Sequence, residues 1–349
     1  MIVIGADTHK QTHTCAAVGE AGQLLGDLTI PARARGFEKL LAWSRSLDEE
    51  RVWAIEDCRH VSGSLERFLV AHGERAVRVP PHLSGASRRG ERVRGKPDPI
   101  DARAVARAAL REGVETLPMA HLDEEALAVK LLLDHREHLV KARTQEQQRL
   151  RWHLHDLWPD LEIPTGGLDR PLWLERVARR LSRAERGARV QIAQELVLEI
   201  RRRTRKVKEL ERELGELVDE QAPQLLGLPG CGTMTAAKLI AETAGASRLG
   251  SDAKFARLAG VAPIPASSGK RIRHRLDRGG NRQLNCALHR IAVTQGRDHG
   301  PAREFLARKE AEGKSRREAL RCLKRHLARR VWQLLIEAER ERSPRSVVP

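Results

Sequence analysis

Residues 1–30 of the chain read MIVIGADTHKQTHTCAAVGEAGQLLGDLTI. Residues 1–6 are a short apolar run typical of a buried strand, and residues 12–18 alternate as a second strand. Residues 19–22 form a turn before a third strand at 24–30. The stretch therefore predicts a three-stranded meander. Neither a helix nor a glycine-rich turn directly follows the first strand, which argues against a doubly wound nucleotide-binding fold.

The chain then alternates between helices and strands. Apolar residues at helical spacing predict helices over 36–46 and 62–72, and short apolar runs predict strands over 51–55 and 76–79. Three strands followed by alternating helices and strands is the order expected of a ribonuclease-H-like (RNase H-like) α/β domain. We place this domain at residues 1–118.

The rest of the chain is predicted to be mostly helical. Residues 119–222 form a helical, coiled-coil region, either between domains or dimerising, in which the basic run 201–206 is compatible with nucleic-acid binding. Residues 223–340 form a mostly α-helical C-terminal domain, and residues 341–349 a disordered tail. The heptad seam of the coiled coil comprises Ala193, Leu196, Ile200, Arg203, Val207, Leu210, Leu214 and Leu217.

Composition narrows the classes of function. The chain has 349 residues, with 64 Lys and Arg against 47 Asp and Glu, and a formal net charge of +17. Such a charge indicates an anionic polymer partner, most simply nucleic acid, bound either specifically or non-specifically. The tyrosine count is 0, which excludes a phosphotyrosine nucleophile. Five scattered cysteines indicate reduced thiols, and no segment is expected to cross a membrane, so we expect a cytoplasmic, nucleoid-associated protein.

Four acidic residues occur where a metal site is expected. Asp7 and Glu56 directly follow predicted strands, and Asp98 and Asp101 lie one turn apart at the start of a predicted helix. Several carboxylates together can hold the divalent cations that activate phosphoryl transfer, with Mg²⁺ the expected ion. The alternative is that these acids are turn formers and helix N-terminal residues. His9, without neighbouring cysteine pairs, is interpreted as a scattered polar residue.

The C-terminal domain carries two candidate phosphate contacts. The sequence around Gly230 and Gly232 reads LPGCGTMTAAKLI, which is typical of a helix-hairpin-helix whose backbone N–H groups bind phosphates, although a plain connecting turn is the alternative. Further on, Ser267 and Ser268 lie beside several cations, where a phosphate could be held and attacked, although composition alone describes a flexible loop. The cations are Lys270, Arg271, Arg273, Arg275, Arg278 and Arg282.

The order and spacing of these motifs resemble those of a known family. The motifs are GADTHK at 5–10, IE at 55–56, KPDPIDAR at 96–103, LPGCG at 228–232, AGVAP at 259–263, SG at 268–269 and RGGNR at 278–282. They are similar to those of the insertion-sequence-110 (IS110) family transposases, also called bridge recombinases, and of the related pilin-gene invertases. The resemblance spans nearly the whole chain. Many members have a Thr-Gly-x-Tyr stretch shortly after the glutamate, which this chain lacks.

The resemblance implies a fold and a set of site residues. It implies an N-terminal domain similar to Holliday-junction resolvases, with a DEDD tetrad that falls on Asp7, Glu56, Asp98 and Asp101. It also implies a C-terminal transposase domain whose serine nucleophile falls on Ser268, with Ser267 as the fallback. In this family a noncoding bridge RNA pairs with target and donor DNA, and the protein acts as a homo-oligomer, a dimer or a tetramer.

The mechanism that we expect joins the two sites. The acids hold Mg²⁺ against the scissile phosphate while Ser268 attacks it and forms a phosphoserine link. Arg271, Arg273 and Arg275 either stabilise the developing charge or clamp the backbone. The alternatives are a metal-dependent nuclease or a conventional RNase H-like strand-transfer transposase without a serine adduct, and a non-catalytic DNA- or junction-binding protein.

Overall fold

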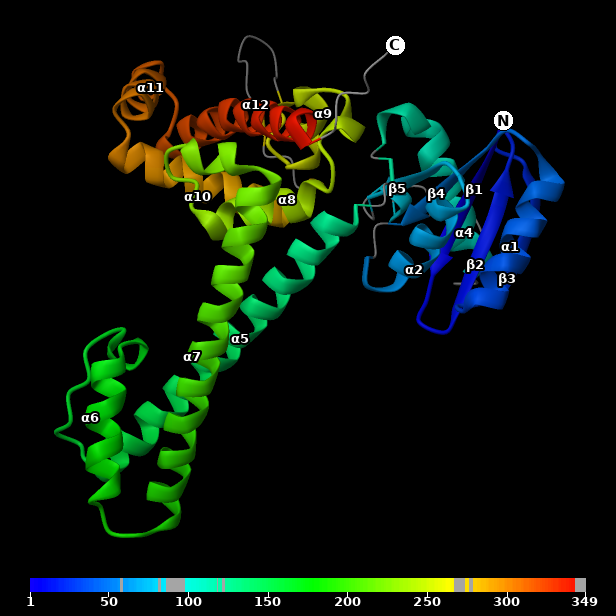
Figure 1. Cartoon of the computed structure of the whole chain (residues 1–349). Helices are drawn as coiled ribbons and strands as arrows, with labels where there is room; N and C mark the ends of the chain where they lie inside the picture. Colours follow the sequence, from blue (N-terminus) through cyan, green and yellow to red (C-terminus); the bar gives the residue numbers. More distant parts are fainter. Residues whose placement is uncertain are drawn as a thin grey trace.

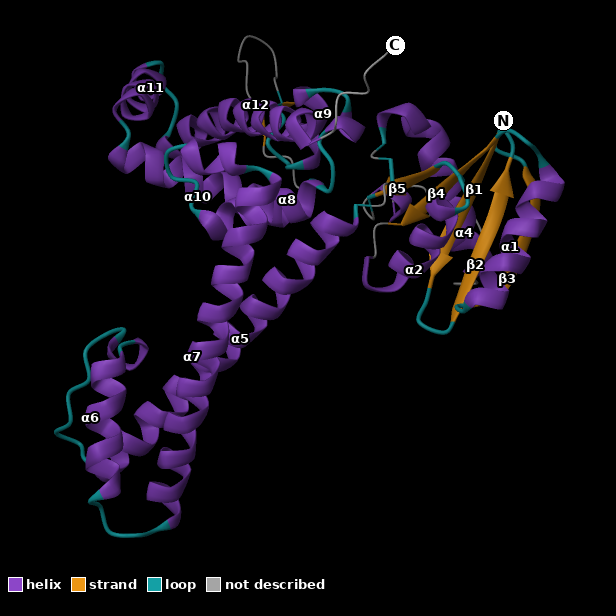
Figure 2. Ribbon diagram, viewed as in Figure 1, coloured by secondary structure: helices purple, strands orange, loops and turns teal. Residues whose placement is uncertain are grey.

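The computed structural model of the chain describes residues 1–56, 59–80, 83–85, 98–117, 119–120, 123–266, 274–275 and 279–342, and only the backbone of Arg59, His60 and Asp98. Figure 1 shows a sheet domain, a helical C-terminal region and a long helical stalk. Figure 2 shows that the large sheet lies at one end of the molecule and that the stalk consists of helices. No helix in the described part of the chain combines the length and apolar character needed to cross a membrane.

The sheet has five strands in the order β3-β2-β1-β4-β5. The first three strands form an antiparallel meander, and β4 and β5 run parallel to β1. This order and these directions agree with the RNase H-like arrangement expected from the sequence. The strands are β1 (Ile2–Thr8), β2 (Thr12–Val18), β3 (Leu24–Pro31), β4 (Arg51–Glu56) and β5 (Ala76–Val79).

Helices cover both faces of the sheet, because its central strands are apolar on both sides. On one face, α1 (Ala34–Leu47) and α2 (Arg59–Ala71) pack on a core that contains Ile4 and Trp53. On the other face, α4 (Asp98–Glu112) packs on a core that contains Val3. Successive residues of a strand point to opposite faces, so the odd-numbered residues of β1 face α4.

Glu74 anchors the edge of the sheet domain from a buried position. Its carboxylate accepts hydrogen bonds from Arg51 Nη2 at 2.6 Å and from Trp53 Nε1 at 3.0 Å. Burial alone would raise the pKa of Glu74, but these hydrogen bonds outweigh it and hold the pKa below its ordinary value of 4.5. A carboxyl group with a lowered pKa in the folded state stabilises the fold above its unfolded-state pKa.

We expect Glu74→Gln to lower the free energy of unfolding by about 2 kcal/mol at pH 7, because it leaves the partly buried Arg51 guanidinium without its countercharge. The difference from wild type should shrink as the pH falls below about 4.5 and through the folded-state pKa, where the wild-type carboxylate is also neutralised. Urea unfolding at several pH values measures this, with the exposed Glu49→Gln as the control. A difference that does not change between pH 7 and pH 3 would contradict the assignment.

The stalk is an antiparallel pair of long helices, α5 (Glu124–Leu157) and α7 (Ala188–Gln221), with α6 (Pro171–Ser182) packed near its tip (Figure 1). The heptad seam of α7 therefore packs against α5 of the same chain. Arg203, the charged member of the seam, donates to Glu146 Oε1 of α5 at 2.8 Å. This ion pair between α7 and α5 compensates the charge of Arg203, which interrupts the apolar pattern of the seam.

The described part of the C-terminal region contains five α-helices and one short pair of antiparallel strands. Its core includes Phe255, Leu284, Ile291 and Val331 and continues into the near ends of α5 and α7. The last helix ends at Arg342, so the first two residues of the expected tail are helical, and 343–349 lie outside the described residues. The elements are α8 (Thr233–Thr243), α9 (Asp252–Leu258), β6 (Ile264–Pro265), β7 (His274–Arg275), α10 (Arg282–Asp298), α11 (Gly300–Ala311) and α12 (Arg316–Arg342).

Besides a helical segment at residues 83–85, the described structure contains four short 3-10 turns. They lie at the ends of longer elements or between them, where the chain changes direction. They are η1 (Val114–Thr116), η2 (Gly167–Asp169), η3 (Pro223–Gly227) and η4 (Ser247–Leu249).

Candidate active site

Asp7 and Glu56 are neighbours at the ends of two central parallel strands. β1 and β4 pair in the register Gly5 to Ala54 and Ala6 to Ile55, so the next step along both strands places Asp7 beside Glu56. Both residues lie on the face that α4 covers, because Val3 and Ala54 belong to the core on that side. Asp7 is buried, and Glu56 is partly exposed. The sheet thus brings together two carboxylates that the sequence predicted separately.

Gly5 allows α4 to approach this edge of the sheet very closely. A Cβ atom on Gly5 would lie 2.0 Å from the carbonyl oxygen of Ala102 and 2.5 Å from the backbone nitrogen of Ala106. Asp101, which is buried, immediately precedes Ala102 on the first turn of α4. Two residues after Gly5, Asp7 points to the same face. The close approach at Gly5 therefore places the start of α4, with Asp101, on the side of the sheet that carries Asp7 and Glu56.

Two polar residues that the sequence did not indicate contact these acids. His9 Nε2 lies 3.2 Å from Asp7 Oδ2, so the histidine interpreted above as a scattered polar residue belongs to the site. The buried Ser84 donates a hydrogen bond from Oγ to Glu56 Oε1 at 2.5 Å. Ser84 thus holds the Glu56 carboxylate by a hydrogen bond, and His9 lies within ion-pair distance of Asp7. Only the position of His9 two residues after Asp7 could have suggested its role.

The chemistry of the donor set suits a hard divalent cation, because carboxylate oxygens are the ligands that such ions prefer. Within the described side chains, no group of three or more His, Cys, Asp and Glu residues is gathered closely enough to hold a metal ion. The side chain of Asp98, the first residue of α4, lies outside that description. Burial, with a further contribution from the Asp7 carboxylate, raises the pKa of Cys15, so this thiol stays protonated and is a poor nucleophile.

The second candidate site belongs to the segment between α9 and α10, whose two ends are held together. The backbone N–H of Asn281 donates to Leu258 O at 2.6 Å. The Asn285 side chain donates to Ala259 O at 2.9 Å and to Gly260 O at 3.0 Å. These bonds close the intervening segment into a loop with a fixed base.

The β6–β7 pair continues this closure, with Ile264 opposite Arg275. The expected nucleophile Ser268 and its fallback Ser267 fall in the connection between the two strands and lie outside the described residues, as do the cations Lys270, Arg271, Arg273 and Arg278. Arg275 on β7 and Arg282, the first residue of α10, are both exposed. The described part of the expected basic face is thus accessible to an anionic ligand.

A buried ionic network supports the base of this loop. Glu242 on α8 accepts from Lys130 Nζ of α5 at 2.6 Å through Oε1 and from Asn281 Nδ2 at 2.6 Å through Oε2. Burial opposes the charge of Lys130, but its hydrogen bond to Glu242 outweighs this effect and raises the pKa of the lysine. On the same helix, the buried Lys238 donates to Gln283 Oε1 at 2.9 Å and pairs with Glu137. The network connects the stalk, α8 and the start of α10.

We expect Glu242→Gln to lower the free energy of unfolding by about 2 kcal/mol, because the amide cannot balance the charge of Lys130 in a buried site. Urea unfolding measures the change. Glu213→Gln, on the exposed face of α7, is the matched control and should change stability by less than about 0.5 kcal/mol. Equal effects of the two substitutions would show that the network does not stabilise the fold.

The candidate helix-hairpin-helix glycines have different surroundings. Cys231 N donates to Leu228 O at 2.9 Å across a turn in which Gly230 has a φ of 81°. A Cβ at Gly230 would lie 3.0 Å from Thr294 Cβ, so this glycine packs against α10. Gly232 is exposed at the N-terminal end of α8, with nothing within 4 Å of an added Cβ. Of the two positions, only Gly232 leaves room for a ligand.

Comparison with known proteins identifies two matching regions. Residues 4–159 match a model described as a transposase, and residues 222–307 match a model described as the transposase IS116/IS110/IS902 family. The chain is 27% identical to the 44.8 kDa protein of insertion element IS116 from Streptomyces clavuligerus, over 96% of this chain and 94% of that protein. It is 26% identical to the 42 kDa protein of insertion element IS900 from Mycobacterium paratuberculosis, over 95% and 94% of the two chains. A putative transposase, y4pF/y4sB, of Sinorhizobium fredii is 27% identical over 82% of this chain and 71% of its own.

Proposed function

Because the chain belongs to the IS116/IS110/IS902 family of insertion-sequence transposases, which are enzymes of DNA strand transfer, we propose that it cuts and rejoins DNA by attack of a serine on a phosphate. Ser268 is the proposed nucleophile. The proposed divalent-metal site, with Mg²⁺ as the ion, comprises Asp7, Glu56, Asp98 and Asp101.

The observation that carries this proposal is the arrangement of the acids. Asp7 and Glu56 lie side by side at the ends of adjacent strands, and Asp101 lies on the first turn of α4, which packs on the same face. Bound there, a divalent cation would neutralise charge on the phosphate and polarise it towards attack. His9 and Ser84 would keep the carboxylates oriented, since each contacts one of them in the folded protein.

The serine step conserves the energy of the phosphodiester bond. A new bond forms between Ser268 Oγ and phosphorus, and the bond from phosphorus to one sugar oxygen breaks. The serine loses its proton, and the departing sugar oxygen gains one. Attack of a sugar hydroxyl on the phosphoserine then reverses the exchange and releases the serine, so no external energy source is needed for rejoining.

Phosphate contacts of the C-terminal region complete the proposal. The N-terminus of α8, which Gly232 leaves open, would bind a backbone phosphate in the manner of a helix-hairpin-helix. Arg275 and Arg282, both exposed, would bind phosphates near the serine segment. None of these contacts reads base sequence.

We also propose that a noncoding bridge RNA supplies sequence recognition and that the protein acts as a homo-oligomer. The resemblance of the motifs to bridge recombinases supports the RNA. A net charge of +17 exceeds what a few phosphate contacts require, and it would allow the protein to neutralise phosphates of both DNA and RNA. The proposed domains are 1–118, 119–222 and 223–340.

The decisive experiment looks for a covalent protein–DNA adduct. Purified protein is mixed with end-labelled DNA spanning the element junction, RNA transcribed from the flank of the element, and Mg²⁺, and the products are separated on denaturing gels. Wild type should give a denaturant-resistant adduct that is absent from Ser268→Ala and Asp101→Ala. Ser267→Ala and Asp27→Ala, the latter on the exposed face of β3, are the matched controls and should retain it.

Each alternative has its own result. Cleaved DNA without an adduct, undiminished in Ser268→Ala, would replace the serine mechanism with that of a metal-dependent nuclease or a conventional strand-transfer transposase. Binding without cleavage, unchanged in Asp101→Ala, would leave a DNA-binding protein. Omission of the RNA tests guidance separately, since an adduct at the same site without RNA would reject it.

A further inference from the structure

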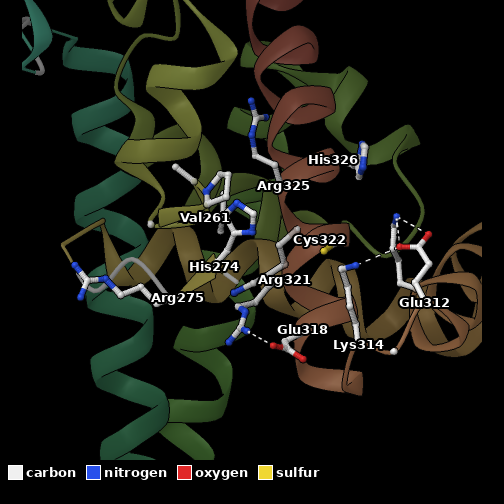
Figure 3. Close-up of a pocket in the computed structure, with 16 residues that line it drawn as sticks. Val261, His274, Arg275, Glu312, Lys314, Glu318, Arg321, Cys322, Arg325 and His326 are labelled. Atoms are coloured by element: carbon white, nitrogen blue, oxygen red, sulfur yellow. Dashed lines mark hydrogen bonds and ion pairs between the residues drawn. The ribbon is translucent and has the colours of Figure 1, made fainter. Parts of the chain in front are cut away.

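A cavity of about 620 Å³ opens beside the β6–β7 hairpin. Its walls come from residues 260–263, from β7, from the turn after α11 and from one face of α12 (Figure 3). In Figure 3, His274, Arg321 and Cys322 lie near the middle of the labelled group, and Glu312 and Lys314 lie to one side. None of Asp7, Glu56 and Asp101, the expected acids whose side chains are described, lines this cavity.

The walls of the cavity carry an excess of positive charge. Among the described residues that line it are six Lys and Arg side chains and two Glu side chains. Glu312 forms ion pairs with Lys309 at 2.8 Å and with Lys314 at 3.2 Å, so its single negative charge faces two cations. Glu318 lies 3.6 Å from Arg321. The remaining cations are Arg275, Lys324 and Arg325, of which Arg325 forms an ion pair with Asp252 at 3.0 Å.

The pKa values of two groups in the cavity wall are lowered, in part by this positive charge. Burial lowers the pKa of His326, and the charges of Arg329, Arg325, Lys309 and Arg308 lower it further. Burial and the charge of Arg321 likewise lower the pKa of Lys324. Cations that hinder the protonation of their neighbours indicate a positive potential that an anion would relieve.

The cavity is also too large for a phosphate alone and is partly apolar. Its volume falls within the roughly 300–1,000 Å³ of small-molecule sites. Val261, Ala262 and Pro263 form an apolar wall at the start of the segment that leads to β6. A planar base on this wall and a phosphate among the cations would together occupy such a space. A nucleotide, which combines a planar base with an anionic phosphate, therefore fits this cavity.

We propose that this cavity binds one unpaired nucleotide of the DNA strand, with its base on the Val261–Pro263 wall and its phosphate among the cations of α12 and β7. The proposal rests on the proposed function, because β7, which lines the cavity, directly follows along the chain the segment that contains the proposed nucleophile. A base still paired in a duplex cannot enter, so occupation requires a nucleotide that has left the stack.

Cys322 provides a probe inside the cavity, and Cys286 provides a control in the same molecule. Cys322 lines the cavity and is partly exposed, whereas Cys286 is exposed on α10 outside it. Full-length protein is treated with N-ethylmaleimide in EDTA, without RNA, at saturating single-stranded DNA of about 12 nucleotides. Peptide mass spectrometry then gives the alkylation rate of each thiol.

We expect single-stranded DNA to slow alkylation of Cys322 at least about fivefold and to leave Cys286 unchanged, because thiol reactivity requires access of the reagent. Duplex DNA of the same sequence should protect Cys322 much less. Equal slowing of both thiols, an unchanged rate at Cys322, or equal protection by duplex DNA would overturn the proposal. Protection by single-stranded RNA but not by DNA would assign the cavity to RNA and would overturn the DNA assignment.

A pair of variants on α12 tests the charges. Arg321→Gln should weaken binding of the single-stranded DNA about tenfold, as loss of one charge-assisted contact would, whereas Arg317→Gln, one turn earlier and outside the cavity, should not. Equal affinities of the two variants would reject the cavity as the binding site. This assay contains no metal and forms no adduct, so the cavity and the serine mechanism can each fail while the other stands.

Discussion

Replacing Gly5 by alanine is expected to lower the free energy of unfolding of the sheet domain by about 3 kcal/mol, the upper end of the cost of overpacking. The added Cβ would lie 2.0 Å from Ala102 O, which is a backbone atom of α4, and the backbone of β1 fixes the position of the Cβ, so neither atom can rotate away. Relief requires α4 to move by more than 1 Å away from β1. That movement carries Asp101 away from Asp7, and a misplacement of about 1 Å typically costs a hundredfold in rate.

The two consequences are measured separately, by urea unfolding and by DNA cleavage at a temperature where the variant is still folded. Gly26→Ala is the matched control in the same sheet, because its Cβ would meet only Trp43 at an ordinary 3.8 Å. It should retain both stability and cleavage. If Gly5→Ala cleaved DNA at the wild-type rate while folded, the start of α4 would not form part of the active site.

The sheet domain could be predicted largely from local patterns. The strands over 12–18 and 76–79 occupy the expected residues, because alternation and short apolar runs report burial directly. The first residues of helices were predicted less accurately than the strands. The helix expected over 36–46 begins at Ala34, and no capping side chain marks its start.

The acids could be predicted from the sequence better than the residues that contact them. Asp7 and Glu56 were found because strand ends are readable, and the parallel pairing of β1 and β4 then places them side by side. Ser84 was not found, since its contact with Glu56 is made across 28 residues and depends on tertiary packing.

The buried network of the C-terminal region left a weak signal in the sequence. Lys238 and Glu242 are charged residues four apart on a helix that is otherwise uncharged, and burial of such residues requires partners. Their spacing says that they share a face, but not which residues they pair with. Lys130 lies 112 residues from Glu242, so only the folded stalk reveals the pair.

Replacing Gly280 by alanine is expected to reduce formation of the covalent adduct at least about a hundredfold, because the two ends of the serine segment can then no longer meet. A Cβ at Gly280 would lie 2.1 Å from Gly260 N and 2.2 Å from Gly260 Cα. These are backbone atoms, so the clash is relieved only by moving one end of the loop away from the other. The hydrogen bond from Asn281 N to Leu258 O, at 2.6 Å, adjoins this contact and would lengthen with it.

Gly300→Ala at the start of α11 is the matched control, because nothing lies within 4 Å of its added Cβ. It should form the adduct at the wild-type rate. The clash in Gly280→Ala lies in the C-terminal region, so the stability of the sheet domain should remain that of the wild type. Hydrogen-exchange rates of the backbone amides of β1 and β4 measure this stability. A Gly280→Ala protein that formed adduct normally would show that the serine acts without a closed loop base, and the clamp formed by Asn281 and Asn285 would then serve stability alone.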